Sequence, residues 1–331
     1  MSAVPTDVLG EIGRLRARER RTTAIIFAAI LIVLAAAPFV FYPVFLMKVL
    51  CFALFACAFN LLLGYGGLLS FGHAAYFGMA GYVSAYAAKS WALTPEMAIL
   101  LGTACALAMG LVFGAVAIRR QGIYFAMITL ALAQMVYFFA LQTPGFTGGE
   151  DGITSVPRGL LFGLIDMEGD RSMYFLVAAI FFVGLLFINR VATSPFGQIC
   201  RALRDNEPRA VSVGFDPDAY KLTMFVLSAG LAGLAGATKS LVFQLASLTD
   251  VHWTMSGEPI LMTLVGGLGT IYGPIIGALA IIGMQNYFAR LGDWITVMQG
   301  LIFVVGILAL RNGILGKAMD AWALLTPERR K

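Results

Sequence analysis

The longest polar interruption of this chain reads Thr193-Ser-Pro-Phe-Gly-Gln-Ile-Cys-Arg-Ala-Leu-Arg-Asp-Asn-Glu-Pro-Arg-Ala-Val-Ser-Val-Gly-Phe-Asp216. It lies between two predominantly apolar runs, residues 172–190 and 218–240. Apolar runs of about 20 residues have the length of a helix that crosses a bilayer. The polar stretch is therefore predicted to be a loop on one side of a membrane, between two spanning helices.

The composition of the whole chain agrees with a membrane protein. Of its 331 residues, 60% are hydrophobic and 12% are charged, whereas about a quarter of the residues in a soluble domain are charged. The apolar runs are continuous and do not alternate with polar residues, which favours helices over a barrel. The sequence thus predicts an all-α polytopic membrane protein. Its net charge of +5 is concentrated at span ends, which indicates topology and not nucleic-acid binding.

Ten spanning helices are predicted, and some of them are expected to be discontinuous or re-entrant. An apolar run of about 24 residues follows the basic N-terminal segment and is too long for a signal peptide, so the first span is expected to be retained. The predicted spans lie near residues 24–43, 45–64, 68–88, 95–118, 122–142, 172–190, 218–240, 258–270, 273–289 and 293–310.

The distribution of lysine and arginine predicts the orientation. Basic residues before residue 24, at 119–120, in the loop 191–217 and in the tail all fall inside if the chain crosses ten times. The domains are then a cytoplasmic basic segment (1–23), one membrane domain (24–311) with a periplasmic loop at 143–171, and a cytoplasmic tail (312–331). Both termini are expected in the cytoplasm.

Two glycine-rich breaks interrupt the apolar runs, one in each half of the chain. Such breaks are typical of discontinuous helices that line a cavity, although glycines also allow close helix packing. The span at 258–270 is short for a full crossing, and both a crossing and a re-entrant path remain open. The predicted hinge residues are Gly64, Gly66, Gly67, Gly266, Gly267, Gly269, Gly273 and Pro274.

The loop 191–217 is the strongest local signal. Residues 199–209 are predicted to form a short amphipathic helix that Pro208 limits, and Gly214 is a helix-ending position. Its polar side chains are expected to project toward a partner, although a solvated positive-inside loop is the alternative. The candidate docking residues are Arg201, Arg204, Asp205, Asn206, Glu207 and Gly214.

The sequence offers no catalytic constellation. It has no P-loop motif, and no aspartate or glutamate falls inside a predicted span. Ser70 and His73 could share a helix face as a hydrolase pair, but they lack a G-x-S-x-G context and an acidic partner. Four cysteines and two histidines show no metal-site spacing. Lys239 is expected to snorkel to the membrane surface.

Several uncharged or weakly basic polar residues fall inside predicted spans. Each is a candidate for lining a permeation path, and the alternative is a hydrogen bond between helices. These pore-lining candidates are Asn60, Ser70, His73, Thr129 and Gln134.

Four separated motifs, in order, resemble those of branched-chain amino acid ABC importer permeases, M-type (LivM-like). They are residues 60–78, residues 122–131 with 147–153, the loop from Ser194 to Gly214, and residues 266–274. The resemblance covers residues 45–311. The loop departs from the family pattern at Pro208 and Arg209, where apolar residues and alanine are common.

The resemblance implies an ABC importer permease fold in the bacterial inner (plasma) membrane. The implied partners are a homologous H-type permease, two cytoplasmic ATPase subunits and a periplasmic substrate-binding protein. ATP and Mg²⁺ would be bound by the ATPases, and this chain would bind no cofactor and act as no enzyme. Leucine, isoleucine and valine are the expected substrates. Urea, short amides, other amino acids, or a passive channel for a small neutral solute are the alternatives.

Overall fold

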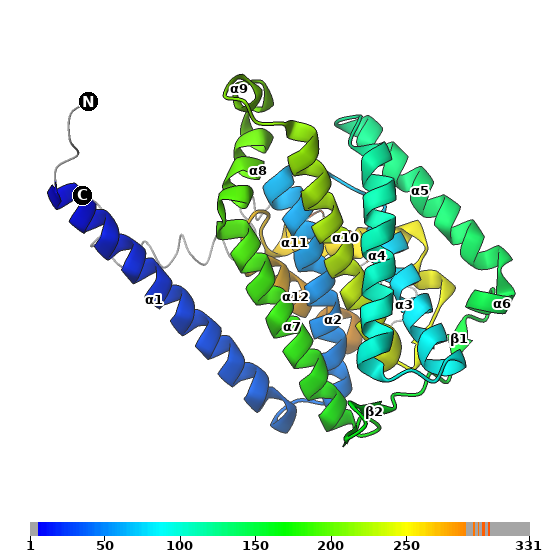
Figure 1. Cartoon of the computed structure of the whole chain (residues 1–331). Coiled ribbons are helices and arrows are strands. Elements are labelled where there is room, and N and C mark those ends of the chain that lie inside the picture. The colour runs from blue at the N-terminus through cyan, green and yellow to red at the C-terminus, as the bar shows by residue number, and fades with distance from the viewer. Residues whose placement is uncertain (1–5, 289–293, 295–296, 298–299, 302–303, 305–331) are drawn as a thin grey trace.

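The computed structural model describes residues 6–288 and the single positions 294, 297, 300, 301 and 304, with side chains from residue 21 onward. The predicted tenth span at 293–310 and the tail at 312–331 lie almost wholly outside these residues. Figure 1 shows a bundle of helices with short strands at one end. The long helices are α1 (Thr6–Ala36), α2 (Pro43–Asn60), α3 (His73–Ser90), α4 (Pro95–Ala117), α5 (Ile123–Gln142), α7 (Asp170–Thr193) and α10 (Pro217–Val242).

The shorter elements lie at the ends of the bundle or inside it. They are the π-helix η2 (Leu61–Tyr65), α6 (Pro144–Thr147), α8 (Pro195–Asp205), α9 (Glu207–Ser212), α11 (Gly257–Gly266) and α12 (Gly273–Tyr287), with 3₁₀-helices η1 (Ala37–Phe39), η3 (Leu248–Asp250) and η4 (Trp253–Ser256). The strands are β1 (Ile153–Thr154), β2 (Leu160–Leu161), β3 (Ile165–Asp166) and β4 (Leu245–Ala246).

The helical content confirms the prediction of an all-α polytopic membrane protein. Six helical segments are long and apolar enough to cross a bilayer, and they are Arg21–Phe39, Pro43–Tyr65, Pro95–Ala117, Ile123–Gln142, Asp170–Thr193 and Pro217–Val242. Each agrees with a predicted span within about four residues. The predicted span at 68–88 differs, because α3 begins only at His73 and residues 66–72 are extended.

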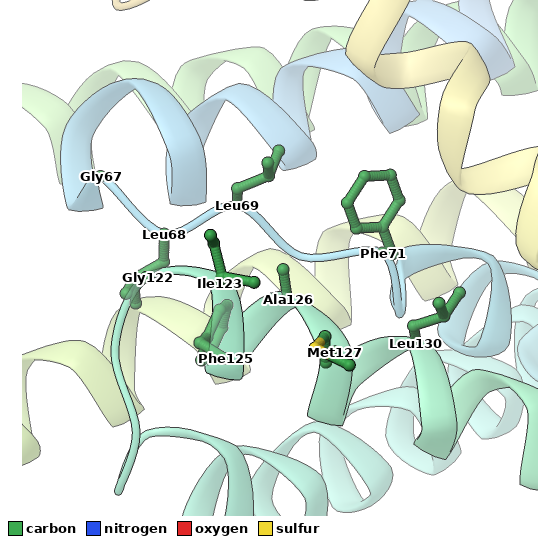
Figure 2. A pocket seen from close by; sticks show the side chains of 10 residues that line it. All are labelled: Gly67, Leu68, Leu69, Phe71, Gly122, Ile123, Phe125, Ala126, Met127 and Leu130. Carbon is green, nitrogen blue, oxygen red and sulfur yellow. The ribbon is translucent and has the colours of Figure 1, made fainter.

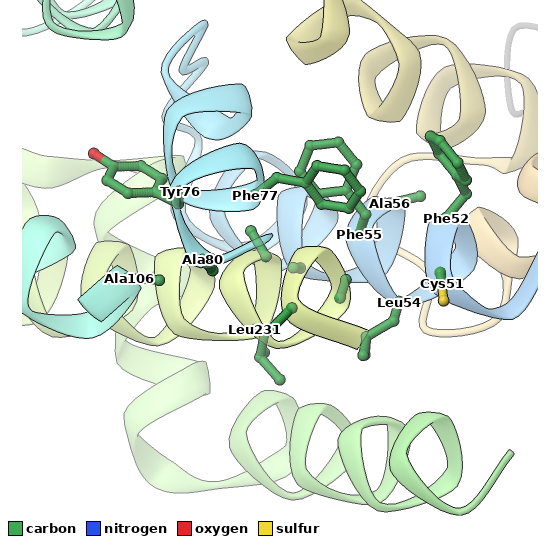
Figure 3. Packing of buried hydrophobic residues seen from close by; sticks show 14 of the residues in the cluster. Cys51, Phe52, Leu54, Phe55, Ala56, Tyr76, Phe77, Ala80, Ala106 and Leu231 are labelled. Atoms are coloured by element: carbon green, nitrogen blue, oxygen red, sulfur yellow. The ribbon is translucent and has the colours of Figure 1, made fainter. Parts of the chain in front are cut away.

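The core forms where α10 packs against α2, α3 and α4. Small residues on α10 allow the backbones to approach closely, as is typical of helices in membranes. A Cβ atom on Gly236 would overlap the carbonyl oxygen of Phe77, so only glycine fits there. Aromatic rings fill the adjoining space, and Phe55 stacks on Phe77 with ring centroids 4.4 Å apart (Figure 3). α2 and α10 are therefore the central helices, and α4 and α5 have wide exposed apolar faces.

α11 and α12 form a tight helical hairpin within the bundle. α11 has ten residues and a length of about 15 Å, half the thickness of a hydrocarbon layer of about 30 Å. The two helices meet at glycines, because Gly266 abuts the carbonyl of Gly273 and Gly277 abuts that of Met262. Of the two paths left open for residues 258–270, the structure therefore favours the re-entrant half-helix.

The end of the bundle that carries the strands is tied together by backbone pairs and one arginine. β1 pairs with β4 in antiparallel register, so the loop after α5 joins the segment after α10. Arg158 is buried and donates to the carboxylate of Asp170 (2.9 Å) and to the carbonyls of Glu168 (3.1 Å) and Val242 (2.8 Å). This end is called the strand end below, and the opposite end is called the α9 end.

Candidate functional site

The polar loop folds into two helices at the α9 end. Ser194 caps α8 by accepting from the N–H of Gly197 (3.3 Å), and Pro195 follows in the first turn. Asn206 has an extended backbone that ends α8, and its side chain caps α9 by accepting from the N–H of Arg209 (3.1 Å). The prediction of one helix over residues 199–209 is therefore wrong: the break lies at Asn206, and Pro208 is tolerated in the first turn of α9.

α8 is strongly amphipathic and packs one face against the bundle. Gly197, Cys200 and Leu203 are buried on that face. Burial raises the pKa of the Cys200 thiol to about 12. Gly214 follows α9 with a φ of +98°, a conformation that favours glycine, so it ends the helix as the sequence predicts.

Two arginines of α8 reach back to the first glycine break. The guanidinium of Arg201 lies over the ring of Tyr65, 4.4 Å from its centroid, which is a cation–π contact. Arg204 donates to the carbonyl of Gly64 and pairs with the carboxylate of Asp205 (2.8 Å). The stem of Arg204 also lies against Gly67, where a Cβ atom would come within 2.6 Å of its Cγ. α8 is therefore attached directly to the end of α2.

Asn60 joins the two glycine breaks, which are about 200 residues apart in sequence. Its amide donates to the carbonyl of Thr270 (2.8 Å), and its oxygen accepts from the N–H of Gly269 (3.0 Å). A Cβ atom on Gly64 would lie 2.8 Å from the nitrogen of Gly269, so the two backbones are in contact there. Residues 60–67, 201–204 and 267–272 together form what we call the coupling junction.

The remaining predicted hinge residues surround this junction. Gly267 and Gly269 have φ values of +124° and +72°, which turn the chain between α11 and α12. Pro274 lies in the first turn of α12, where its missing N–H costs no helical hydrogen bond. Gly266 and Gly273 provide the close approach of the two helices, whereas Gly66 has open surroundings and carries no such constraint.

The expectation that the loop's polar side chains project toward a partner is wrong for several of them. Glu207 pairs with Lys221 (2.8 Å), which is nearly buried at the start of α10, and it accepts from Gln121 (3.0 Å). Arg201 and Arg204 turn toward the bundle, and Asn206 serves as a helix cap. The reason is that each of them satisfies a backbone group or a buried charge within this chain. Sequence spacing places residues on a helix face but does not tell which face is covered.

The Glu207–Lys221 pair makes a charge-reversal prediction. Glu207→Lys is expected to lower transport about tenfold or more, because two lysines then compete for one nearly buried position. Exchange of the two charges, Glu207→Lys with Lys221→Glu, restores most of the activity. The measurement is uptake into vesicles at equal amounts of membrane-inserted protein. A double variant as inactive as the single one would mean that Glu207 acts on another subunit instead.

The surface that remains open on this loop is the outer side of α9. Val211 and Val213 are 48% and 70% exposed, and Arg209 and Pro208 lie beside them on the exposed side. Figure 1 places α9 at the tip of the molecule. Exposed valines on a polar loop tip are typical of a contact with another protein.

Thiol labelling can report which side of the membrane this tip faces. With a pKa of about 12, Cys200 holds roughly one thiolate in ten thousand molecules at pH 8, and thiolate is the reacting form. Native Cys200 is therefore expected to stay unlabelled, while Val213→Cys reacts at the rate of an exposed thiol. A membrane-impermeant maleimide should label Val213→Cys only when the cytoplasmic side is accessible. Labelling from the outside would reverse the predicted topology.

Four of the five pore-lining candidates are buried and hydrogen-bonded within the chain. Ser70 accepts from the N–H of Gly72 (3.1 Å), and Thr129 accepts from the N–H of Phe71 (3.1 Å). His73 pairs through Nε2 with Ser228 (2.9 Å), so it does not activate Ser70, and the pair forms no hydrolase dyad. Asn60 belongs to the coupling junction. For Gln134, the buried Oε1 has no hydrogen-bond partner among the described residues. Their role in lining a path stays a prediction.

A cavity of about 440 Å³ lies beside the extended segment before α3, between it and the start of α5 (Figure 2). Its walls are apolar, as Leu68, Phe71, Ile123 and Met127 show. It offers no charged or hydrogen-bonding side chain to a ligand, so it suits a hydrocarbon surface. None of the five candidates lines it.

The sequence analysis was wrong about Lys239. Its ammonium group does not reach the membrane surface but pairs with both oxygens of Asp250 at 2.5 Å, and both side chains are nearly buried. Asp250 lies outside the predicted spans, but the segment 247–256 turns back into the bundle, where Val251 contacts Gly78 and Ser256 bonds to Phe71 and Ala74. The available signal was the capping pattern Ser247-x-x-Asp250, which the sequence analysis did not use.

No group of three or more histidine, cysteine, aspartate or glutamate side chains that could hold a metal ion occurs in the part of the chain that the structure describes.

Comparisons with known proteins identify relatives of this chain. A family model described as "Branched-chain amino acid transport system / permease component" matches residues 41–310. The high-affinity branched-chain amino acid transport system permease protein LivM of Escherichia coli K12 is 26% identical over 283 residues, which cover 77% of this chain and 65% of that protein. BraD of Pseudomonas aeruginosa, a permease protein of the same kind of system, is 24% identical over 287 residues, 80% of this chain and 92% of that protein. No solved structure matches the chain.

Proposed function

Because the chain belongs to the family of branched-chain amino acid transport permeases, we propose that it is the membrane-spanning subunit of an ATP-driven importer of leucine, isoleucine and valine. In this proposal it lies in the bacterial inner membrane with the α9 end in the cytoplasm. It pairs with a homologous H-type permease, two cytoplasmic ATPases hold ATP and Mg²⁺, and a periplasmic binding protein delivers the substrate.

The observation that carries the proposal is the coupling junction. The exposed tip of α9 is continuous with α8, and α8 holds Gly64 through Arg204 and Tyr65 through Arg201. Asn60 connects that break with the turn between α11 and α12. A displacement of α8 by an ATPase therefore reaches both glycine breaks through two contacts. A passive channel would have no need for such a connection.

The half-helix α11 supports the same mechanism. Discontinuous helices provide a place where the chain can bend without breaking the helical hydrogen bonds of a full span. Since its turn is held at the junction and its other end lies deep in the bundle, a shift at Gly269 tilts α11. The permease then has two states that ligands on either side of the membrane can bias.

Replacement of Arg204 tests the link between ATP hydrolysis and transport. Arg204→Ala removes the bond to the Gly64 carbonyl, and we expect leucine uptake to fall about tenfold or more while ATP hydrolysis by the complex continues. The matched control is Arg120→Ala, an exposed arginine in the connection between α4 and α5. Wild-type coupling in Arg204→Ala would contradict the role of the junction.

The function itself is tested with the whole complex in liposomes. This chain, its partner permease, the ATPases and the binding protein are reconstituted, and uptake of labelled leucine, urea and an aromatic amino acid is measured with and without ATP. Leucine uptake that needs both ATP and the binding protein supports the proposal. ATP-dependent uptake of another solute only would change the substrate, and flux without ATP would favour the channel.

A further inference from the structure

A second cavity, of about 460 Å³, gathers charged side chains inside the bundle. Its lining includes Lys48 of α2, Lys239 of α10, Asp250 of η3 and Glu258 of α11. The volume lies within the usual range for sites of small molecules. Ionisable residues at membrane depth are costly, so a group of four around one cavity indicates a function.

The depth of the cavity follows from the helix positions. Lys48 precedes Asn60 by twelve residues, and Gln285 follows Gly273 by the same number, which corresponds to about 18 Å along each helix. Glu258 precedes Gly266 by eight residues, or about 12 Å. These groups thus lie at similar distances from the coupling junction and within a hydrocarbon layer of about 30 Å.

The four charges play two different parts. Lys239 and Asp250 pair with each other at 2.5 Å, and this pair holds the re-entering segment in place. Glu258 accepts from the amide of Gln285 (3.1 and 3.3 Å), which orients its carboxylate. Lys48 lies within electrostatic reach of both Glu258 and Lys239. The lining therefore presents one cation and one anion beside a pair that is already closed.

The rest of the wall is largely apolar. Phe52, Phe243, Leu245 and Met255 border the same cavity. A ligand that fits must then carry a positive and a negative group close together and an apolar body. The two lysines and two carboxylates have no net formal charge, so a ligand of net charge zero suits the site best.

We propose that this cavity holds a zwitterionic amino acid with an apolar side chain. The α-carboxylate binds the ammonium group of Lys48, the α-ammonium binds the carboxylate of Glu258, and the side chain packs on Phe52, Phe243 and Met255. The inference rests on the proposed function and assigns the place where the permease itself holds its substrate during transport.

An adjacent cavity supplies an entrance. It has a volume of about 510 Å³, shares Lys48 and Phe243 with the first, and extends to Phe41 and Tyr42 before α2. These two residues are widely exposed at the strand end, which faces the periplasm in the proposed orientation. Lys48 therefore stands between the entrance and the binding cavity, where it meets the carboxylate of an arriving amino acid.

The test measures equilibrium binding to the purified complex of this chain with its partner permease and ATPases, without ATP. The probes are labelled leucine, leucinamide, which lacks the carboxylate, and 4-methylpentanoate, which lacks the ammonium. Wild type is expected to bind leucine about tenfold or more tightly than either analogue. Lys48→Met should bind leucine and leucinamide equally, and Glu258→Gln should bind leucine and 4-methylpentanoate equally.

Matched controls separate binding from structure. Lys89→Met removes a lysine at the end of α3, outside this cavity, and Glu150→Gln removes an exposed carboxylate. Both controls should keep the preference for leucine over each analogue. A purely structural role of Lys48 or Glu258 would lower the amount of folded complex but leave these preferences unchanged, and that result would overturn the proposal.

The remaining outcomes separate this proposal from the proposed function. Absence of leucine binding to the wild-type complex, or wild-type preferences in both cavity variants, would overturn the cavity assignment even if ATP-dependent leucine uptake occurs. Charge-dependent leucine binding that both variants lose would support the assignment, even if uptake in liposomes does not require ATP and the importer mechanism fails.

Discussion

Gly64→Ala is expected to abolish most transport, with a loss of about a hundredfold at equal protein levels. The added Cβ would lie 2.5 Å from the Asn60 oxygen and 2.8 Å from the Gly269 nitrogen, closer than real Cβ contacts allow. The clamp between the two glycine breaks must then open, and overpacking of this kind costs about 1–3 kcal/mol. The measurement is ATP-dependent leucine uptake in liposomes together with ATP hydrolysis by the same complex.

Gly66→Ala is the matched control for this prediction. The same substitution two residues later meets only Met224 at 3.6 Å and Leu62 at 3.9 Å, which are ordinary contacts, so uptake should stay within about twofold. Alanine favours helical conformations over glycine by about 1 kcal/mol, so propensity alone would make both variants more stable. Equal, near-normal uptake in both variants would show that close contact at Gly64 is unimportant.

Removal of either partner of the Lys239–Asp250 pair is expected to destabilise the permease by about 3–5 kcal/mol. Either Lys239→Met or Asp250→Leu leaves one charge nearly buried without its partner, and an uncompensated buried charge is strongly unfavourable. The measurement is the unfolding midpoint of the detergent-solubilised complex, followed by size-exclusion chromatography.

The double variant makes the result decisive. Lys239→Met with Asp250→Leu removes both charges and should recover most of the stability, because an apolar pair replaces a buried ion pair at little cost. The two single effects must therefore be far from additive. If the single variants unfold at the wild-type midpoint, or if the double variant loses the sum of both effects, the pair does not hold the re-entering segment.

Much of the fold was predictable because it depends on local properties of the chain. Prolines at residues 43, 95, 195, 217 and 274 stand in the first turns of their helices, as expected from the missing N–H of proline. The six apolar segments were found within a few residues because hydropathy is read directly from neighbouring residues. The start of α3 was missed, since residues 68–72 are as apolar as a helix and yet extended.

The site was less predictable, because its contacts join distant parts of the chain. The glycine breaks and the polar loop were identified separately, but nothing in the sequence places Asn60 beside Gly269 or Arg204 beside Gly64. The direction of Glu207 was predicted wrongly for the same reason, as its partner Lys221 belongs to the next long helix. Lys48 and Glu258 were assigned no role, since neither lies near the other in sequence.

The sequence by itself determined that this chain is a helical membrane protein of a transport permease family, because length, hydropathy and motif order are properties of the linear chain. Only the tertiary structure decided that two glycine breaks meet at one junction, that a half-helix returns into the bundle, and that four charged residues share a cavity. The physical reason is that close packing of α10 against α2, α3 and α4 through small residues sets which helix ends coincide. A bilayer makes buried polar groups costly, so each of them is paired by whatever this packing brings near.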